Sequence, residues 1–106
     1  MDDATDYTLL KTLESNPQLT QRQLARQLGF SLGKVNYCLR ALMDKGWVKA
    51  DNFRNSPRKG RYLYVLTPSG IDARARLTKR FLQRKLTEYE ELKEEIERLR
   101  QEAGDE

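Results

Sequence analysis

Apolar residues recur at helical spacing near the start of the chain. The apolar positions between residues 5 and 15 form one helical stripe, made of Tyr7, Leu9, Leu10 and Leu13. The Asn16-Pro17 pair ends this stripe, because proline disfavours α geometry in the residue before it. We therefore predict a first helix over residues 5–15.

Two further helices with a short turn between them follow. Thr20 precedes Gln23 at the spacing of a capping box, in which the side chain of each residue accepts the backbone N–H of the other. We therefore predict a helix from about residue 21 to 28. Gly29 supplies the turn, and Ser31 caps a third helix that ends at Lys45-Gly46. The inward face of this third helix is predicted to be Leu32, Val35, Leu39, Leu42 and Met43. Two helices joined in this way form a helix-turn-helix.

The pattern changes to that of strands after Gly46. Residues 47–53 and 61–66 are rich in β-branched and aromatic side chains, and between them lies the polar loop RNSPRKG. These segments are predicted to form a hairpin. A two-stranded hairpin is marginal alone, so it must pack on the helices, as the wing of a winged helix does.

A long final helix is predicted from Thr67-Pro68 to about residue 102, because threonine is a good cap and proline suits the first helical position. A helix of about 35 residues is roughly 50 Å long, which exceeds what so small a domain can cover. The predicted fold class is mainly α with a small β-hairpin. Residues 1–67 are predicted to form the winged helix-turn-helix domain, and residues 68–106 are predicted to form a coiled-coil-like dimerisation helix.

The far part of this helix carries heptad spacing, with Tyr89 and Ile96 at a positions and Leu92 and Leu99 at d positions. In a parallel pair, Glu88 and Glu95 at g face Lys93 and Arg100 at e. The repeat weakens where Lys85 occupies a d position and Leu86 follows it at e. The predicted dimer contacts are Leu82, Leu86, Tyr89, Leu92, Ile96 and Leu99. The alternative is that this stripe folds back on its own domain.

Charge is divided unevenly along the chain. The net charge is −3 over residues 1–15, +11 over residues 16–80 and −4 over residues 81–106. A basic middle between acidic ends indicates that one region binds a polyanion, although a merely soluble basic surface is the simpler interpretation.

The start of the third helix is the end expected to enter a DNA major groove. Its predicted base-reading residues are Ser31, Gly33, Lys34, Asn36 and Tyr37. Asparagine can pair with adenine, lysine can reach guanine, and glycine permits close approach. An ordinary solvated helix face remains the alternative.

Contacts to the DNA backbone are expected from cationic and polar side chains of the second helix, the third helix and the wing. The wing loop has no acidic residue and is suited to phosphate contact or to minor-groove insertion of an arginine. The predicted backbone and wing residues are Gln21, Arg22, Arg26, Arg40, Arg54, Asn55, Ser56, Arg58, Lys59 and Arg61.

The composition offers little to other classes of function. With one cysteine, Cys38, and no histidine, neither an internal disulfide nor a metal site is expected, and no cofactor is expected. No membrane-spanning run and no signal peptide are recognisable, so a cytoplasmic protein is expected. Cys38 is interpreted as a half-buried small hydrophobe, with a redox sensor as the alternative. No catalytic constellation is present, so we predict that the chain is not an enzyme.

The segments SLGKVNYCLRALMDKGWVKADNFRN and YLYVLTPSGI resemble small bacterial MarR-type regulators associated with exopolysaccharide gene clusters. The resemblance covers nearly the whole chain and implies DNA binding upstream of exopolysaccharide or envelope genes. Larger MarR proteins have further helices that build a ligand cleft at the dimer interface. Since this chain lacks them, control by a small-molecule effector is not expected, although it stays open.

The sequence therefore favours a homodimeric transcriptional regulator that binds specific sites in double-stranded DNA. The competing hypothesis is a winged-helix module for protein–protein interaction, which would recruit a partner through its acidic helix.

Overall fold

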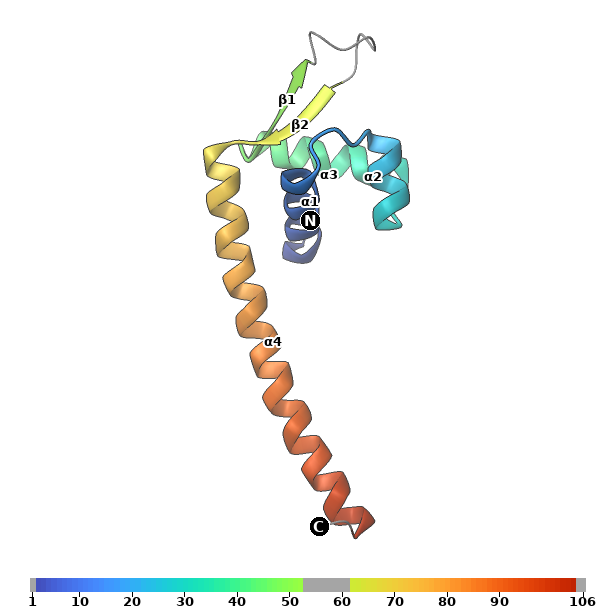
Figure 1. The fold of residues 1–106 in the computed structure, drawn as a ribbon, viewed down its shortest axis with the longest axis vertical. Coiled ribbons are helices and arrows are strands. Elements are labelled where there is room, and N and C mark those ends of the chain that lie inside the picture. The colour runs from blue at the N-terminus through green and yellow to red at the C-terminus, as the bar shows by residue number, and fades with distance from the viewer. Residues whose placement is uncertain (1, 53–61, 105–106) are drawn as a thin grey trace. The chain divides into compact units, whose positions relative to one another are not determined.

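The computed structural model describes residues 2–52 and 62–104. Three helices, α1 (Asp3–Ser15), α2 (Gln21–Leu28) and α3 (Leu32–Asp44), precede strands β1 (Val48–Asn52) and β2 (Tyr62–Leu66). The long helix α4 (Pro68–Ala103) follows (Figure 1). This arrangement is a winged helix-turn-helix with a long C-terminal helix, which confirms the predicted fold class.

The helix starts are set by local caps. Asp2 Oδ1 accepts the Thr5 backbone N–H at 2.8 Å, so α1 begins two residues before the predicted start. The capping box of α2 is complete, because Thr20 and Gln23 each accept the backbone N–H of the other. The Lys34 backbone N–H donates to Ser31 Oγ at 3.0 Å and caps α3 as predicted.

Within the winged helix, two glycines end helices in the left-handed region. Gly29 has φ +70° after α2, and Gly46 has φ +76° after α3. L side chains rarely adopt these values, whereas glycine does so without a Cβ clash. The chain can therefore reverse within one or two residues, which brings α2 close to α3 and α3 close to β1.

The core of the winged helix consists mainly of leucines from the first three helices. Its buried apolar residues are Leu9, Leu10, Leu13, Leu24, Val35, Cys38, Leu39, Leu42, Val48, Tyr64 and Ala73. Each fully buried leucine or valine contributes about 1.5–3 kcal/mol. Leu32, predicted on the inward face of α3, is instead 42% exposed. It is the first residue of the helix, and the described chain does not cover it there.

One ion pair links the start of the domain to the end of α3. The Asp6 carboxylate is buried and accepts from Lys45 Nζ at 3.0 Å. The same ammonium lies over the Trp47 ring, 4.6 Å from its centroid. The sequence analysis did not predict the burial of this acidic residue, which lies in the first turn of α1.

The hairpin is antiparallel, with Val48 opposite Leu66 and Asn52 opposite Tyr62. It leads directly into α4. The Thr67 backbone N–H donates to the Trp47 carbonyl at 3.0 Å, and Thr67 Oγ1 accepts the Gly70 N–H at 3.1 Å. A Cβ added at Gly70 would lie 1.9 Å from the Trp47 carbonyl oxygen. Only glycine therefore allows the first turn of α4 to approach this backbone.

The chain divides into two compact units, Met1–Ala75 and Arg76–Glu106. The predicted division at residues 67 and 68 marks the start of α4, whereas the first unit continues into that helix. The reason is that Gly70 and Ala73 are buried within its first two turns.

Two glycines within helices should respond oppositely to alanine. Gly70→Ala should lower the free energy of unfolding by about 2 kcal/mol or more, because its methyl group meets backbone that cannot yield. Gly33→Ala is the matched control. No atom lies within 4 Å of its Cβ position, so the gain in helix propensity should raise stability by up to about 1 kcal/mol. Urea denaturation measures both values, and equal effects at the two positions would contradict the close approach at Gly70.

Candidate nucleic-acid interface

The outward face of α3 lies opposite its buried face. Val35, Leu39 and Leu42 are buried, whereas Gly33, Tyr37 and Arg40 follow one another at steps of four and three on the exposed side. Tyr37 is 66% exposed. The position of Gly33 is open, so another molecule can approach the helix backbone there. This face combines an open backbone, an aromatic ring and a cation.

Several predicted base-reading groups are already engaged within the chain. Ser31 Oγ accepts the N–H that caps α3. The Lys34 ammonium is 4.0 Å from the centroid of the Phe30 ring. This cation–π contact holds the charge beside the start of the helix, where it can still meet a phosphate or a base edge.

Asn36 belongs to a hydrogen-bonded relay that joins three elements. Asn36 Nδ2 donates to Gln21 Oε1 at 3.3 Å, and Gln21 Nε2 donates to the Tyr64 hydroxyl at 3.0 Å. The relay therefore connects α3, the start of α2 and strand β2. Asn36 and Gln21 were predicted as DNA contacts, and the structure places both half-buried. Tyr64 was missed by sequence reasoning, although a buried tyrosine in a strand signals a partner for its hydroxyl.

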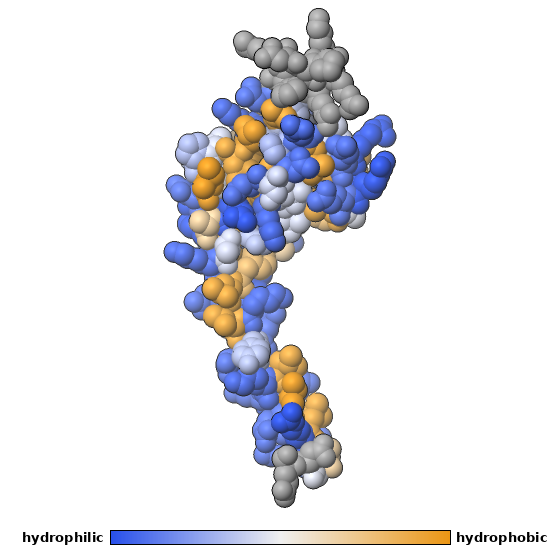
Figure 2. Space-filling model, in the orientation of Figure 1, coloured by the Kyte–Doolittle hydropathy of each residue, from blue (hydrophilic) through white to orange (hydrophobic). Residues whose placement is uncertain are grey.

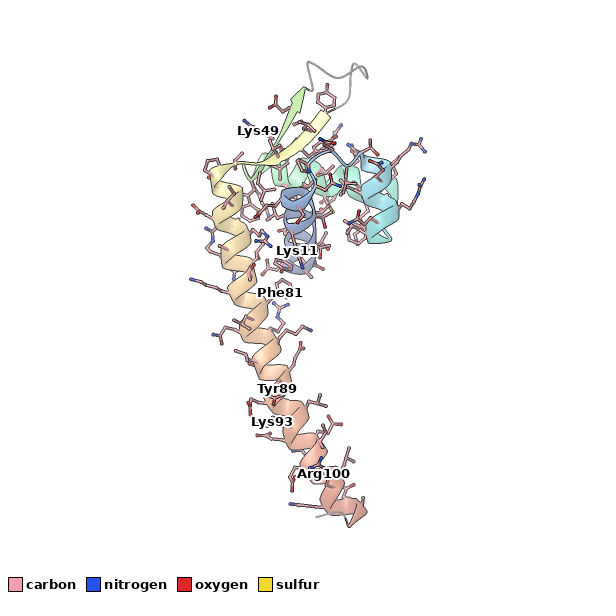
Figure 3. All side chains as sticks on the ribbon, in the orientation of Figure 1. Lys11, Lys49, Phe81, Tyr89, Lys93 and Arg100 are labelled. Carbon is pink, nitrogen blue, oxygen red and sulfur yellow. The ribbon has the colours of Figure 1, made fainter. Side chains whose placement is uncertain are left out.

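The remaining predicted backbone contacts fall into two groups. Arg22 and Arg26 are exposed on α2, and Arg40 is exposed on α3. The predicted wing residues lie outside the described residues; they are Arg54, Asn55, Ser56, Arg58, Lys59 and Arg61. Lys49 is a further exposed cation, on β1, that the sequence prediction did not include (Figure 3).

The second unit consists of the remainder of α4, which carries an exposed apolar stripe. Its six predicted contact residues are between 41% and 56% exposed: Leu82, Leu86, Tyr89, Leu92, Ile96 and Leu99. Figure 2 shows apolar side chains along this segment, bordered by hydrophilic ones.

Charged side chains beside the stripe pair within the helix. Lys85 Nζ lies 3.0 Å from Glu88 Oε2, and Lys93 Nζ lies 3.8 Å from Glu90 Oε2. The Lys93 ammonium also lies 5.2 Å from the centroid of the Tyr89 ring, and Figure 3 labels both residues on α4. The apolar residues of the stripe stay 41–56% exposed beside these pairs.

Other kinds of site find little support in the part of the chain that the structure describes. Across residues 2–52 and 62–104, no three acidic or cysteine side chains gather where they could hold a metal ion. None of the helices in these ranges is long and apolar enough to cross a membrane.

Comparison with known proteins identifies the fold. Residues 2–49, which contain α1, α2 and α3, match the protein family described as winged helix-turn-helix DNA-binding. No curated protein matches the sequence.

Solved structures similar to this chain include several MarR-family proteins. A MarR/EmrR family transcriptional regulator from Acinetobacter sp. ADP1 is 17% identical with a TM-score of 0.66, and the match covers 94% of this chain and 75% of that one. A mutant of MepR from S. aureus is 26% identical with a TM-score of 0.63, covering 94% and 72%. FabT from Streptococcus pneumoniae, solved in complex with DNA, is 23% identical with a TM-score of 0.60, covering 82% and 59%. The chain therefore has the winged-helix fold of MarR-family transcriptional regulators.

Cys38 lies on the buried face of α3 and is 2% exposed. Desolvation by this burial raises the pKa of the thiol above its ordinary value of 9.0, and the nearby Lys34 charge lowers it only in part. Because the thiolate is the reactive form, the structure favours the small buried hydrophobe over the redox sensor.

The folded protein should protect Cys38 from alkylation. At pH 8 we expect iodoacetamide to react more than about tenfold faster in urea than in buffer. Because the folded pKa is raised, the stabilisation from the neutral thiol is complete below pH 9.0 and is lost as the pH rises through the folded value. As the pH rises above 9.0, the free energy of unfolding of Cys38→Ala should therefore fall less than that of the wild type. Equal alkylation rates in buffer and urea would contradict the burial.

Proposed function

We propose that this chain is a MarR-type transcriptional regulator that binds specific sites in double-stranded DNA as a homodimer. The observation that carries the proposal is the outward face of α3, on which Gly33, Tyr37 and Arg40 lie in line. Helix α3 is the second helix of the helix-turn-helix. A helix in this position enters the major groove in winged-helix proteins that bind DNA.

Electrostatics supports duplex DNA as the partner. The net charge of +11 over residues 16–80 lies in the segment that contains α2, α3 and the wing. Arg22, Arg26 and Lys49 are exposed in that segment and would contact phosphates. The DNA complex of FabT, which has a similar fold, is consistent with this assignment.

The exposed stripe of α4 supports the homodimer. In a parallel pair the stripe from Tyr89 to Leu99 would bury its apolar side chains against the same residues of a second copy. The acidic and basic residues at the flanking g and e positions would then favour the parallel orientation. Control of exopolysaccharide or envelope genes rests on the sequence resemblance and is proposed on that basis only.

Substitutions on the outward face of α3 should impair DNA binding without unfolding the chain. Arg40→Ala should weaken binding about tenfold at low salt and reduce the slope of log K against log salt concentration by about 1, because one phosphate contact is lost. Tyr37→Ala should reduce the preference for the selected duplex over random duplex by about tenfold, because a base contact is lost. Fluorescence anisotropy with labelled duplexes measures both effects.

Arg98→Ala is the matched control for charge, because Arg98 is exposed on α4 outside the heptad seam. It should leave affinity and salt slope unchanged. If the wild type shows no preference among duplexes even at low salt, sequence-specific regulation is wrong, and the protein-interaction module becomes the better hypothesis.

Polar substitutions in the stripe should dissociate the dimer. In the full chain, Leu92→Ser with Ile96→Ser should raise the dimer dissociation constant at least about 100-fold, since each buried apolar side chain contributes about 1.5–3 kcal/mol. Glu91→Ser with Glu94→Ser is the control, because it places the same number of serines outside the seam. Light scattering distinguishes the species, and a dimer that survives the first pair of substitutions contradicts the seam.

A further inference from the structure

Leu32 is an apolar side chain that the described chain leaves 42% exposed at the start of α3. It follows the cap residue Ser31 and precedes Gly33, whose Cβ position has no neighbour within 4 Å. A large apolar group therefore lies at the end of the helix that would enter the major groove. Burial of such a group against a partner is favourable, since it removes apolar area from water.

The polar groups around Leu32 are engaged within the chain. Ser31 Oγ accepts the N–H that caps α3, and the Asn36 amide donates to Gln21 at 3.3 Å. The Lys34 ammonium lies over the Phe30 ring. Readout by hydrogen bonds from Ser31 and Asn36 would compete with these contacts. The largest uncommitted surfaces at the start of the helix are then the side chains of Leu32 and Tyr37.

The chemistry of the major groove identifies what an apolar side chain can read there. Thymine presents a 5-methyl group, whereas the other base edges present mainly hydrogen-bond donors and acceptors. Leucine packed on those polar edges would remove them from water without replacing their hydrogen bonds, which is unfavourable. A leucine at this position therefore discriminates in favour of thymine.

We propose that Leu32 is a specificity-determining residue that packs on the 5-methyl group of a thymine in the operator. This inference rests on the proposed function and deepens it, because it names the base feature that α3 recognises. Duplex DNA is favoured as the occupant over an apolar protein surface because α3 lies in the segment of net charge +11.

The test uses the full-length chain and a duplex selected from a random library by repeated binding. Each thymine of that duplex is replaced in turn by deoxyuridine, which keeps the base pairing and removes only the methyl group. At one thymine in each half-site, the wild type should lose about fourfold in affinity, the equivalent of burying one methyl group. Leu32→Ala should bind the thymine duplex more weakly and show no further loss on the deoxyuridine duplex.

Two further variants separate the methyl contact from a folding defect. Leu32→Met keeps an apolar side chain of similar size and should retain the dependence on the methyl group. Leu32→Gln is similar in length but polar, and it should lose the dependence. Circular dichroism should show the same helix content for all three variants, because Leu32 lies outside the core.

The possible failures are distinguishable. If a preferred duplex is selected but removing its methyl groups does not change the affinity of the wild type, this inference alone is overturned. It is also overturned if their removal lowers the affinity of Leu32→Ala as much as that of the wild type. A methyl dependence that disappears in Tyr37→Ala but persists in Leu32→Ala also overturns it. If selection yields no preferred duplex, the proposed function fails and the inference fails with it.

Discussion

Burial of one face of α3 is the interaction on which the rest of the winged helix depends. Val35, Leu39 and Leu42 are almost completely removed from water among the leucines of α1 and α2. Rotating α3 to present other residues would expose these side chains at a cost of about 1.5–3 kcal/mol each. The core therefore determines that Gly33, Tyr37 and Arg40 face outward, and the surface proposed to contact DNA is a consequence of packing.

The relay from Asn36 through Gln21 to Tyr64 places a second constraint on that surface. It satisfies two amides and a phenol that would otherwise be partly buried without partners, at an expected cost of about 1–3 kcal/mol for each unsatisfied group. It also joins the helix that would read bases to a strand of the wing. A shift of the wing on phosphate contact would thus be opposed by the same hydrogen bonds that orient the start of α2.

Features encoded by neighbouring residues were predictable from the sequence, and features that depend on distant contacts were not. The caps at Thr20 and Ser31 and the turn at Gly29 act over three or four residues, so the sequence located α2 and α3 accurately. The burial of Asp6 depends on Lys45, and the exposure of Leu32 depends on where the core ends. The engagement of Asn36 likewise depends on Gln21, which lies fifteen residues away.

The charges along α4 bear on the orientation of the proposed dimer more than on its affinity. Glu88 already pairs with Lys85 within the helix, so pairing it with Lys93 of a second copy would exchange one exposed ion pair for another. Exposed pairs contribute about 0–1 kcal/mol, and the exchange is nearly neutral. Affinity must then come from the apolar positions between Tyr89 and Leu99. Because this seam spans less than two full heptads, the dimer should be weak, and occupancy of DNA should rise more steeply than in proportion to protein concentration.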